Sequence, residues 1–257
     1  MSEVSSFAKN TQAVIKDTDT IMKDIPASCQ RVHFYTQKLG KAQCQKQDEV
    51  YTKFLNITRV LSAYSAQLDV LASDELIDAS QNFDSLEASL NENEKLKPEE
   101  AKAIVSLSEL LASSLTQGKR EDQLSYYLYE ADESVQKLLH TLSKAIKRNY
   151  LFELNTERAQ LKSYHNKLAL IGKKQEFIAW EMYRSQLYEK ENVLSEKIEL
   201  AKRVANALDS AAKVHKKLTL GSDDLTKKEL KNYLKDFSKE LKPVFKDMKN
   251  VYKSYKG

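Results

Sequence analysis

The chain has 257 residues, of which 41 are basic and 37 acidic, so its net charge of +4 does not indicate one class of partner. It holds only five glycines and three prolines, whereas an average soluble chain of this length holds about 31 in total. Sheets and hairpins need these residues at their turns, so the composition excludes a strand-rich fold and predicts an all-α protein built from long helices.

Two helical segments are predicted in the first part of the chain, at roughly 3–25 and 27–73. In the first, side chains repeat at alternating steps of three and four, which places them on one helix face. They are Val4, Phe7, Thr11, Val14, Thr18, Ile21 and Ile25. Pro26 separates the two segments, because proline kinks a helix or begins a new one. The second segment carries the clearest heptad seam of the chain: Val50, Phe54, Ile57, Leu61, Tyr64, Leu68 and Leu71.

The two cysteines, Cys29 and Cys44, leave two states open. On one straight helix their Cα atoms would lie about 22 Å apart, whereas a disulfide needs about 7 Å or less. Pairing therefore requires the chain to reverse between them, and Gly40 is the helix breaker available for that turn. Export would favour the disulfide, and a reducing cytosol would favour two buried thiols.

Two shorter helices are predicted next, at roughly 75–90 and 98–117. The apolar anchors of the first are Phe83, Leu86 and Leu90. Pro98 suits the first turn of the second helix, and the carboxylates of Glu99 and Glu100 complement the dipole there.

A long segment without proline follows at 120–218. Its first part carries an apolar stripe whose mean step is 3.6 when Glu157 is counted as a member: Val135, Leu139, Leu142, Ile146, Tyr150, Leu154, Leu161, Tyr164, Leu168 and Ile171. Glu157 falls within this stripe and needs a partner, for which Arg158 or a tyrosine hydroxyl on another helix is suitable. The stripe changes phase at Gly172, which indicates a turn or a stutter. A lone glycine costs a helix only about 1 kcal/mol, so we favour one continuous or slightly bent helix of about 150 Å.

The last segment, 223–255, repeats the seam pattern. Its members are Leu230, Leu234, Phe237, Leu241, Val244, Met248, Val251 and Tyr255. Pro243 lies inside this seam, which predicts a kink rather than an end.

Charge is distributed unevenly along the chain. Residues 74–101 contain nine acids and two lysines, and residues 213–257 contain thirteen lysines and six acids. Two solvated faces of opposite sign that attract each other would explain this. Alternatively, the basic end meets an anionic surface such as lipid headgroups. The candidate contacts are Lys239, Lys242 and Lys246.

No sequence motif indicates catalysis, metal binding or a cofactor. None of the four histidines (His33, His140, His165 and His215) belongs to an HExxH pattern or follows a glutamate three residues earlier. Two cysteines fifteen residues apart do not predict a zinc site, and five scattered glycines build no phosphate loop. We therefore predict a protein that is not an enzyme, with no catalytic or metal-binding residues and no cofactor.

Three tyrosines, Tyr126, Tyr127 and Tyr129, follow Lys119 and Arg120. Aromatic side chains beside basic ones can stack nucleic-acid bases. Here Tyr126 and Tyr129 share one helix face that neighbouring leucines support, so we expect core packing and no nucleic-acid partner.

Two resemblances to known proteins are carried by short stretches. Residues 35–42 (YTQKLGKA), Gln47–Glu49 and the seam from Val50 resemble the first helix of BAR-domain proteins. That resemblance implies a crescent-shaped dimer of long, kinked antiparallel helices with lysines on a membrane-facing concave side. Residues 27–31 (ASCQR), 149–154 (NYLFEL) and 241–243 (LKP) resemble uncharacterised all-helical proteins of bacterial envelopes. This second resemblance implies a structural Cys29–Cys44 disulfide and no particular activity.

These observations predict one domain, 1–257, with an all-α fold. We expect an elongated antiparallel helical bundle or coiled coil of five to six segments, with one or two very long helices. The function expected is a structural or protein-interaction bundle, with self-association open. The alternative is a BAR-like module that binds anionic membrane and senses or imposes curvature.

The compartment is left open by the sequence. Residues 1–25 are amphipathic and charged and do not form a secretion signal, and residues 103–118 are too short and polar to span a bilayer. The second resemblance favours a bacterial envelope or periplasm, and the alternative is the cytoplasm.

Overall fold

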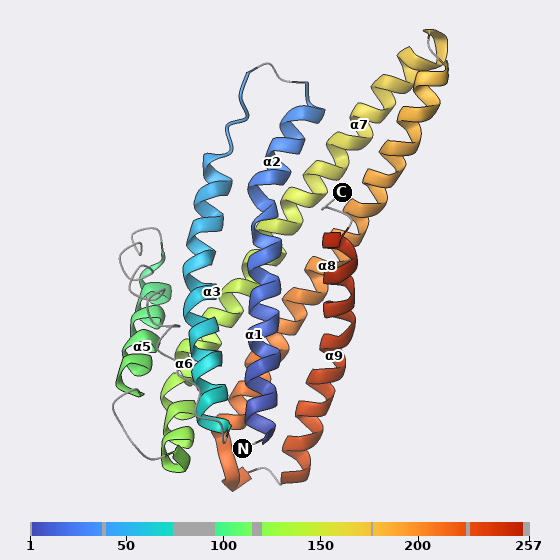
Figure 1. Ribbon diagram of the computed structural model, residues 1–257. Helices are drawn as coiled ribbons and strands as arrows, with labels where there is room; N and C mark the ends of the chain where they lie inside the picture. Colours follow the sequence, from blue (N-terminus) through green and yellow to red (C-terminus); the bar gives the residue numbers. More distant parts are fainter. Residues whose placement is uncertain are drawn as a thin grey trace.

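The structure is a computed structural model that describes residues 2–37, 40–73, 96–114, 120–175, 177–224 and 227–253. Within these ranges the secondary structure is helical and contains no strand, which confirms the all-α prediction (Figure 1). The helices are α1 (Ser2–Met22), α2 (Asp24–Tyr35), α3 (Gln45–Ala72), α5 (Pro98–Ser114), α6 (Arg120–Ala145), the π-helical turn η3 (Ile146–Tyr150), α7 (Leu151–Gln175), α8 (Phe177–Asp224) and α9 (Lys227–Lys253). The predicted helix at 75–90 lies outside the described residues.

α2 continues in the direction of α1 after a break at a single residue, Lys23 (Figure 1). The break has a local cause, because Pro26 lies in the first turn of α2 and has no N–H to donate to the carbonyl of Met22. The two helices together therefore form one long wall of the molecule.

The chain reverses between α2 and α3, so the segment predicted at 27–73 is two helices and not one. Gln37 and Gly40 both have positive φ, +53° and +93°, a backbone conformation that ends a helix. The reversal brings Cys29 and Cys44 together: their Cα atoms are 6.0 Å apart and their Sγ atoms are bonded. The disulfide ties the middle of α2 to the residue that precedes α3.

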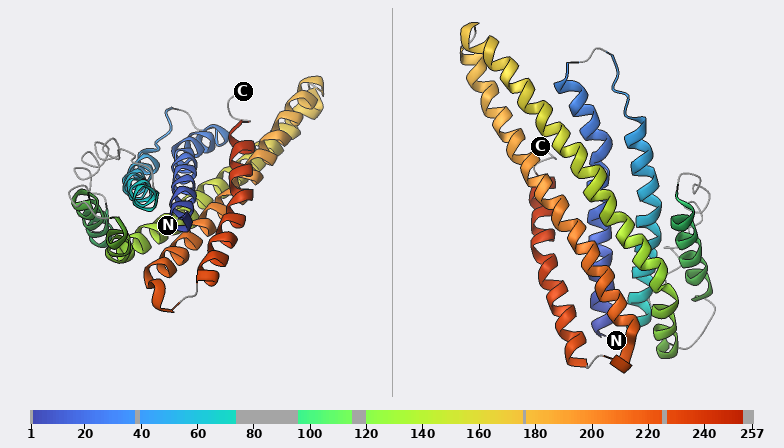
Figure 2. Two further views of the ribbon diagram at one scale, coloured as in Figure 1. Left: turned by 60° about the horizontal axis from the view of Figure 1, so that its bottom comes forward. Right: turned by 180° about the vertical axis from the view of Figure 1, so that it is seen from behind.

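A second reversal separates α7 from α8. We favoured one continuous helix through Gly172, and this interpretation is wrong: α7 ends at Gln175, and α8 begins at Phe177 and runs back along α7 and α6 (Figures 1 and 2). The phase change of the apolar stripe marks the change of helix. The α7–α8 pair projects beyond the ends of α2 and α3 (Figure 2).

The core follows the predicted apolar seams where the structure describes them. All seven side chains of the first seam are buried, and so are Phe54 to Leu71 of the second. α9 continues through Pro243 and buries Leu234, Phe237, Leu241, Val244, Met248 and Val251. Among the tyrosines after Arg120 the prediction is wrong, because Tyr127 is buried while Tyr126 and Tyr129 are exposed.

None of the described helices combines the length and the apolar character needed to cross a membrane. The described residues also contain no cluster of three or more histidine, cysteine, aspartate or glutamate side chains that could hold a metal ion.

One carboxyl group on α1, that of Asp17, is partly buried in a way that disfavours its charged form. Asp17 is half-buried, and its Oδ2 atom has no hydrogen-bond partner among the described residues. Burial raises the pKa of Asp17 to about 6, and the neighbouring Lys16 opposes this shift only in part. The folded protein therefore holds a proton that the unfolded chain has released, over the interval from about pH 4 to about pH 6.

The free energy of unfolding should consequently fall as pH rises through this interval. An Asp17→Asn variant has no proton to lose, so it should be more stable than the wild type at pH 7, and the gain should disappear below about pH 4. Urea denaturation at several pH values measures this difference. Glu133→Gln, at an exposed position, is the control, and an Asp17→Asn gain independent of pH would contradict the assignment.

The disulfide should stabilise the fold mainly by restricting the unfolded chain. Closing a loop of 15 residues contributes about 3 kcal/mol in the chain-entropy model. We therefore expect Cys29→Ser/Cys44→Ser to lower the free energy of unfolding by about that amount. Denaturation with and without dithiothreitol checks it: reduction should destabilise the wild type and leave the double variant unchanged. A fully reduced wild type that is as stable as the oxidised one would contradict it.

Candidate functional site

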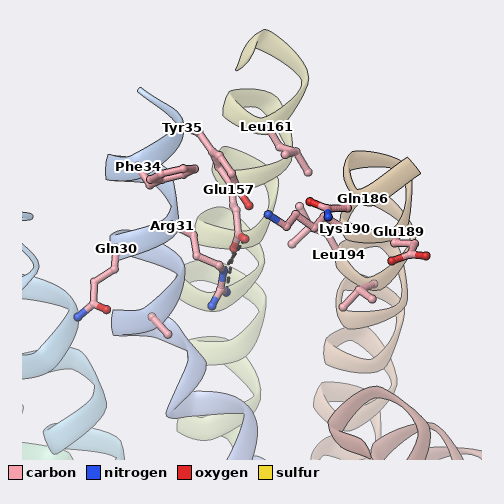
Figure 3. Close-up of a pocket in the computed structure, with 12 residues that line it drawn as sticks. Gln30, Arg31, Phe34, Tyr35, Glu157, Leu161, Gln186, Glu189, Lys190 and Leu194 are labelled. Atoms are coloured by element: carbon pink, nitrogen blue, oxygen red, sulfur yellow. Dashed lines mark hydrogen bonds and ion pairs between the residues drawn. The ribbon is translucent and has the colours of Figure 1, made fainter. Parts of the chain in front are cut away.

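A groove of about 780 Å³ lies between α2, α7 and α8 (Figure 3). Its walls are one face of α2 and one face of α8, and its floor is α7. The residues that line it are Ala27, Gln30, Arg31, Phe34, Tyr35, Glu157, Leu161, Gln186, Glu189, Lys190, Val193 and Leu194. The lining combines apolar side chains with polar ones, as in grooves that bind peptides and helices.

An ion pair between α2 and α7 lies in the floor of the groove. Glu157 is 4% exposed and accepts two hydrogen bonds from the Arg31 guanidinium, from Nε at 2.6 Å and from a terminal nitrogen at 3.0 Å (Figure 3). Ser28 donates a third, at 2.7 Å. The partner that Glu157 needs is therefore Arg31 and not Arg158, whose guanidinium bonds Asn155 on its own helix.

The same arginine connects Glu157 to a second buried carboxylate. Asp24, at the start of α2, accepts from Arg31 at 3.0 Å, from the Tyr150 hydroxyl at 2.9 Å and from the Lys197 ammonium at 2.7 Å. Lys197 comes from α8 and is only 1% exposed. Burial lowers the pKa of Lys197, and the carboxylate of Asp24 acts in the opposite direction.

We call this set the interhelical charge network: Asp24, Arg31, Glu157 and Lys197, with Ser28 and Tyr150. It joins α2, η3, α7 and α8 at one level of the molecule. Tyr150 is the last residue of the π-helical turn, an uncommon local structure that the sequence does not signal.

Aromatic rings support the wall of the groove near the end of α2. The Tyr35 ring lies 5.7 Å from Phe34 and 5.9 Å from Tyr164 on α7, and Tyr164 lies 6.3 Å from Tyr183 on α8. Burial raises the pKa of Tyr35, and the carboxylate of Glu157 raises it further, so this hydroxyl stays protonated. Phe34 is 59% exposed at the edge. These rings hold the three helices at the spacing that leaves the groove open.

The groove lies along α8 beyond the surface of α1 and α8 on which α9 packs, which we call the seat of α9. α9 packs against α1 and α8, and its end lies halfway up the molecule (Figures 1 and 2). There Asp247, Asn250 and Val251 line a small hollow together with residues 195–203 of α8. Val193 and Leu194, which belong to the groove, precede these residues on α8. α9 packs between α1 and α8, and the groove lies between α2 and α8. Because α2 continues in the direction of α1, the two spaces are bounded by corresponding helices.

A different group of polar side chains is sealed inside the core. Tyr64 bonds His215 Nε2 at 2.7 Å, and His215 Nδ1 bonds Asp132 at 3.1 Å. Burial lowers the pKa of His215. Burial alone would raise the pKa of Asp132, but hydrogen bonds from His215, Lys216 and Gln136 outweigh it and hold this pKa well below its usual range. His215 and Tyr64 are 0% and 2% exposed, so this relay-like arrangement is buried except at Lys216, which bonds Asp132 and is 53% exposed.

The sequence-predicted residues lie apart from the groove lining. Lys239, Lys242 and Lys246 are exposed on α9. Cys29 and Cys44 form the bond between α2 and the start of α3. His140 contacts Asp209, and His165 packs against Trp180. One residue of the site was recognisable from the sequence, the charged Glu157 inside an apolar stripe, whereas nothing in the sequence indicated Arg31 or Lys197.

No protein-family model matches the chain, and comparisons with curated proteins and with solved structures find no similar protein. The resemblances to BAR-domain proteins and to helical envelope proteins therefore stay predictions.

The interhelical charge network should be sensitive to the loss of one partner. Replacing Lys197 by methionine leaves a buried carboxylate without its ammonium, and breaking a buried pair costs about 3–5 kcal/mol. The double variant Asp24→Asn/Lys197→Met removes both charges and should recover much of this loss. Urea denaturation of the two single variants and the double variant measures the coupling. Equal stability of the wild type and Lys197→Met would contradict the role we assign to the pair.

Proposed function

We propose that this protein is a non-enzymatic helical scaffold that binds a protein partner. The partner inserts an amphipathic helix into the groove between α2, α7 and α8. An elongated antiparallel bundle suits this role, because its long helices hold both walls of a groove at a set spacing.

The observation that carries the proposal is the continuity of the groove with the seat of α9. In the lower half of the molecule α9 occupies the space beside α1 and α8. In the upper half the corresponding space, beside α2 and α8, is the groove. A further helix collinear with α9 would cover the exposed ring of Phe34 and the half-buried side chains of Ala27 and Val193, as α9 covers its own seam.

The chemistry of the lining favours a helix with one apolar stripe. The ring of Phe34, which is 59% exposed, and the half-buried side chains of Ala27 and Val193 offer contacts for leucine or aromatic anchors above the buried Leu161 and Leu194. Gln30, Gln186, Glu189 and Lys190 at the edges suit polar positions that flank the stripe. Arg31 and Glu157 neutralise each other, so the partner needs no charge of its own at the floor.

The disulfide supports an oxidising compartment, because such bonds persist in secreted and periplasmic proteins and are rare in a reducing cytosol. We therefore propose an envelope or periplasmic location for the scaffold, where a bound helical partner would meet the oxidised form.

The experiment uses a variant that fills the groove. Ala27→Trp places a large ring between the walls, and Ala159→Trp places the same ring at an exposed position of α7 outside the lining. A phage-displayed library of amphipathic helical peptides is selected on the wild type. The selected peptides are then measured by fluorescence anisotropy on all three proteins.

We expect equal affinity for the wild type and Ala159→Trp, and affinity weaker by at least about tenfold for Ala27→Trp, which corresponds to about 1.4 kcal/mol. Hydrogen exchange should show protection of residues 27–35 and 186–194. Peptides that bind Ala27→Trp as tightly as the wild type, or a selection that yields no helical sequence, would contradict the proposal. A dimer of the wild type that Ala27→Trp abolishes would instead make a second copy the occupant.

A further inference from the structure

α9 carries a continuous row of lysines on its solvent face. Seven lysines follow one another at steps of three or four, and all seven side chains are exposed: Lys228, Lys231, Lys235, Lys239, Lys242, Lys246 and Lys249. We call them the lysine ridge. At 1.5 Å per residue the ridge is about 32 Å long and straight.

The ridge faces away from the body of the molecule. The buried seam of α9, which includes Leu241 and Val244, lies on the other side of the helix. Two acidic residues of α9 contact α8: Glu240 accepts from Ser210, and Asp247 pairs with Arg203 at 2.8 Å. These two negative charges are thus directed toward α8 and away from the ridge.

The ridge is also largely unneutralised. Lys239 lies 3.4 Å from Asp236, and both side chains are more than 60% exposed, so this contact contributes little. The other six lysines have no carboxylate within ion-pair distance among the described residues. Seven aligned cations raise the positive potential along the helix and attract an anionic surface.

A second feature lies at the projecting end of α7 and α8. Large apolar side chains are exposed there: Leu170 (76%), Phe177 (66%), Ile178 (76%) and Met182 (68%). This end leans toward the side of the molecule on which α9 lies (Figures 1 and 2). A basic ridge and an exposed apolar end are the two elements that stable attachment to a bilayer requires.

We propose that the protein binds the surface of an anionic lipid bilayer through the lysine ridge, with the apolar end of the α7–α8 pair entering the interface. The ridge contains no arginine, the residue that forms bidentate contacts with nucleic-acid phosphates. Tyr233, an exposed ring on α9, lies under the ammonium of Lys217 and is not free to stack a base. These details favour lipid over nucleic acid.

Cosedimentation with vesicles of phosphatidylcholine containing 30% phosphatidylserine tests the ridge. Binding should occur at low salt, fall as salt rises, and be absent with phosphatidylcholine alone. Lys239→Gln/Lys242→Gln/Lys246→Gln should lower the partition coefficient about 100-fold, because each lysine near the surface contributes a factor of about five. Lys46→Gln/Lys102→Gln/Lys144→Gln changes the net charge equally at exposed positions on α3, α5 and α6, and should bind nearly as the wild type does.

A second pair of variants tests the apolar end. Phe177→Ser/Ile178→Ser should remove the binding that remains at high salt, and Val105→Ser/Phe152→Ser, at exposed positions elsewhere, should not. Circular dichroism verifies that each variant is folded.

Three results would overturn the proposal: equal binding to vesicles with and without phosphatidylserine, equal loss in the two triple-lysine variants, or duplex DNA bound in preference to vesicles at the same salt. The proposal is independent of the groove, because Ala27→Trp should bind vesicles as the wild type does.

Discussion

Three buried charged side chains, Asp24, Glu157 and Lys197, and the half-buried Arg31 that bonds two of them hold the centre of this protein. Moving each of them out of water is costly, and only their mutual hydrogen bonds offset that cost. They come from helices that are distant in sequence, so the network is complete only when α2, α7 and α8 stand at one height and spacing. Apolar seams alone tolerate sliding of one helix past another, whereas this network does not. Because the network fixes the spacing of α2, α7 and α8, it also determines the width of the groove between them.

The two surfaces that we connect with function follow from this arrangement. The groove exists because α9 ends halfway along α8 while α2 and α7 continue. The lysine ridge exists because α9 uses one face for the core and turns its acids toward α8. The two surfaces differ in chemistry, because the groove combines apolar and polar side chains and the ridge is cationic. One molecule therefore has room for a helical partner and a lipid surface together.

The sequence predicted those parts of the fold that depend on local repetition. Heptad spacing identified the buried faces of α1, α3 and α9, because a helix buries the same angular sector at every turn. The reversal before α8 depends on a single weak signal at Gly172, and the reversal after α2 on Gly40, so neither was clear from the chain. Glu157 was recognisable as a charge in an apolar stripe, but its partner Arg31 is 126 residues away. The groove was not predictable, because it depends on where one helix stops relative to three others.

The π-helical turn at Ile146–Tyr150 sets the rotational phase of everything that follows it. Such a turn holds one residue more than the α-helical path would, and one residue corresponds to about 100° around the axis. Deleting a single residue there would restore a regular helix and swing Leu154, Glu157 and Leu161 a quarter-turn or more around α7. The turn thus sets the rotation of α7 relative to α6. With this rotation α6 packs against α8 and α5, and α7 packs against α2.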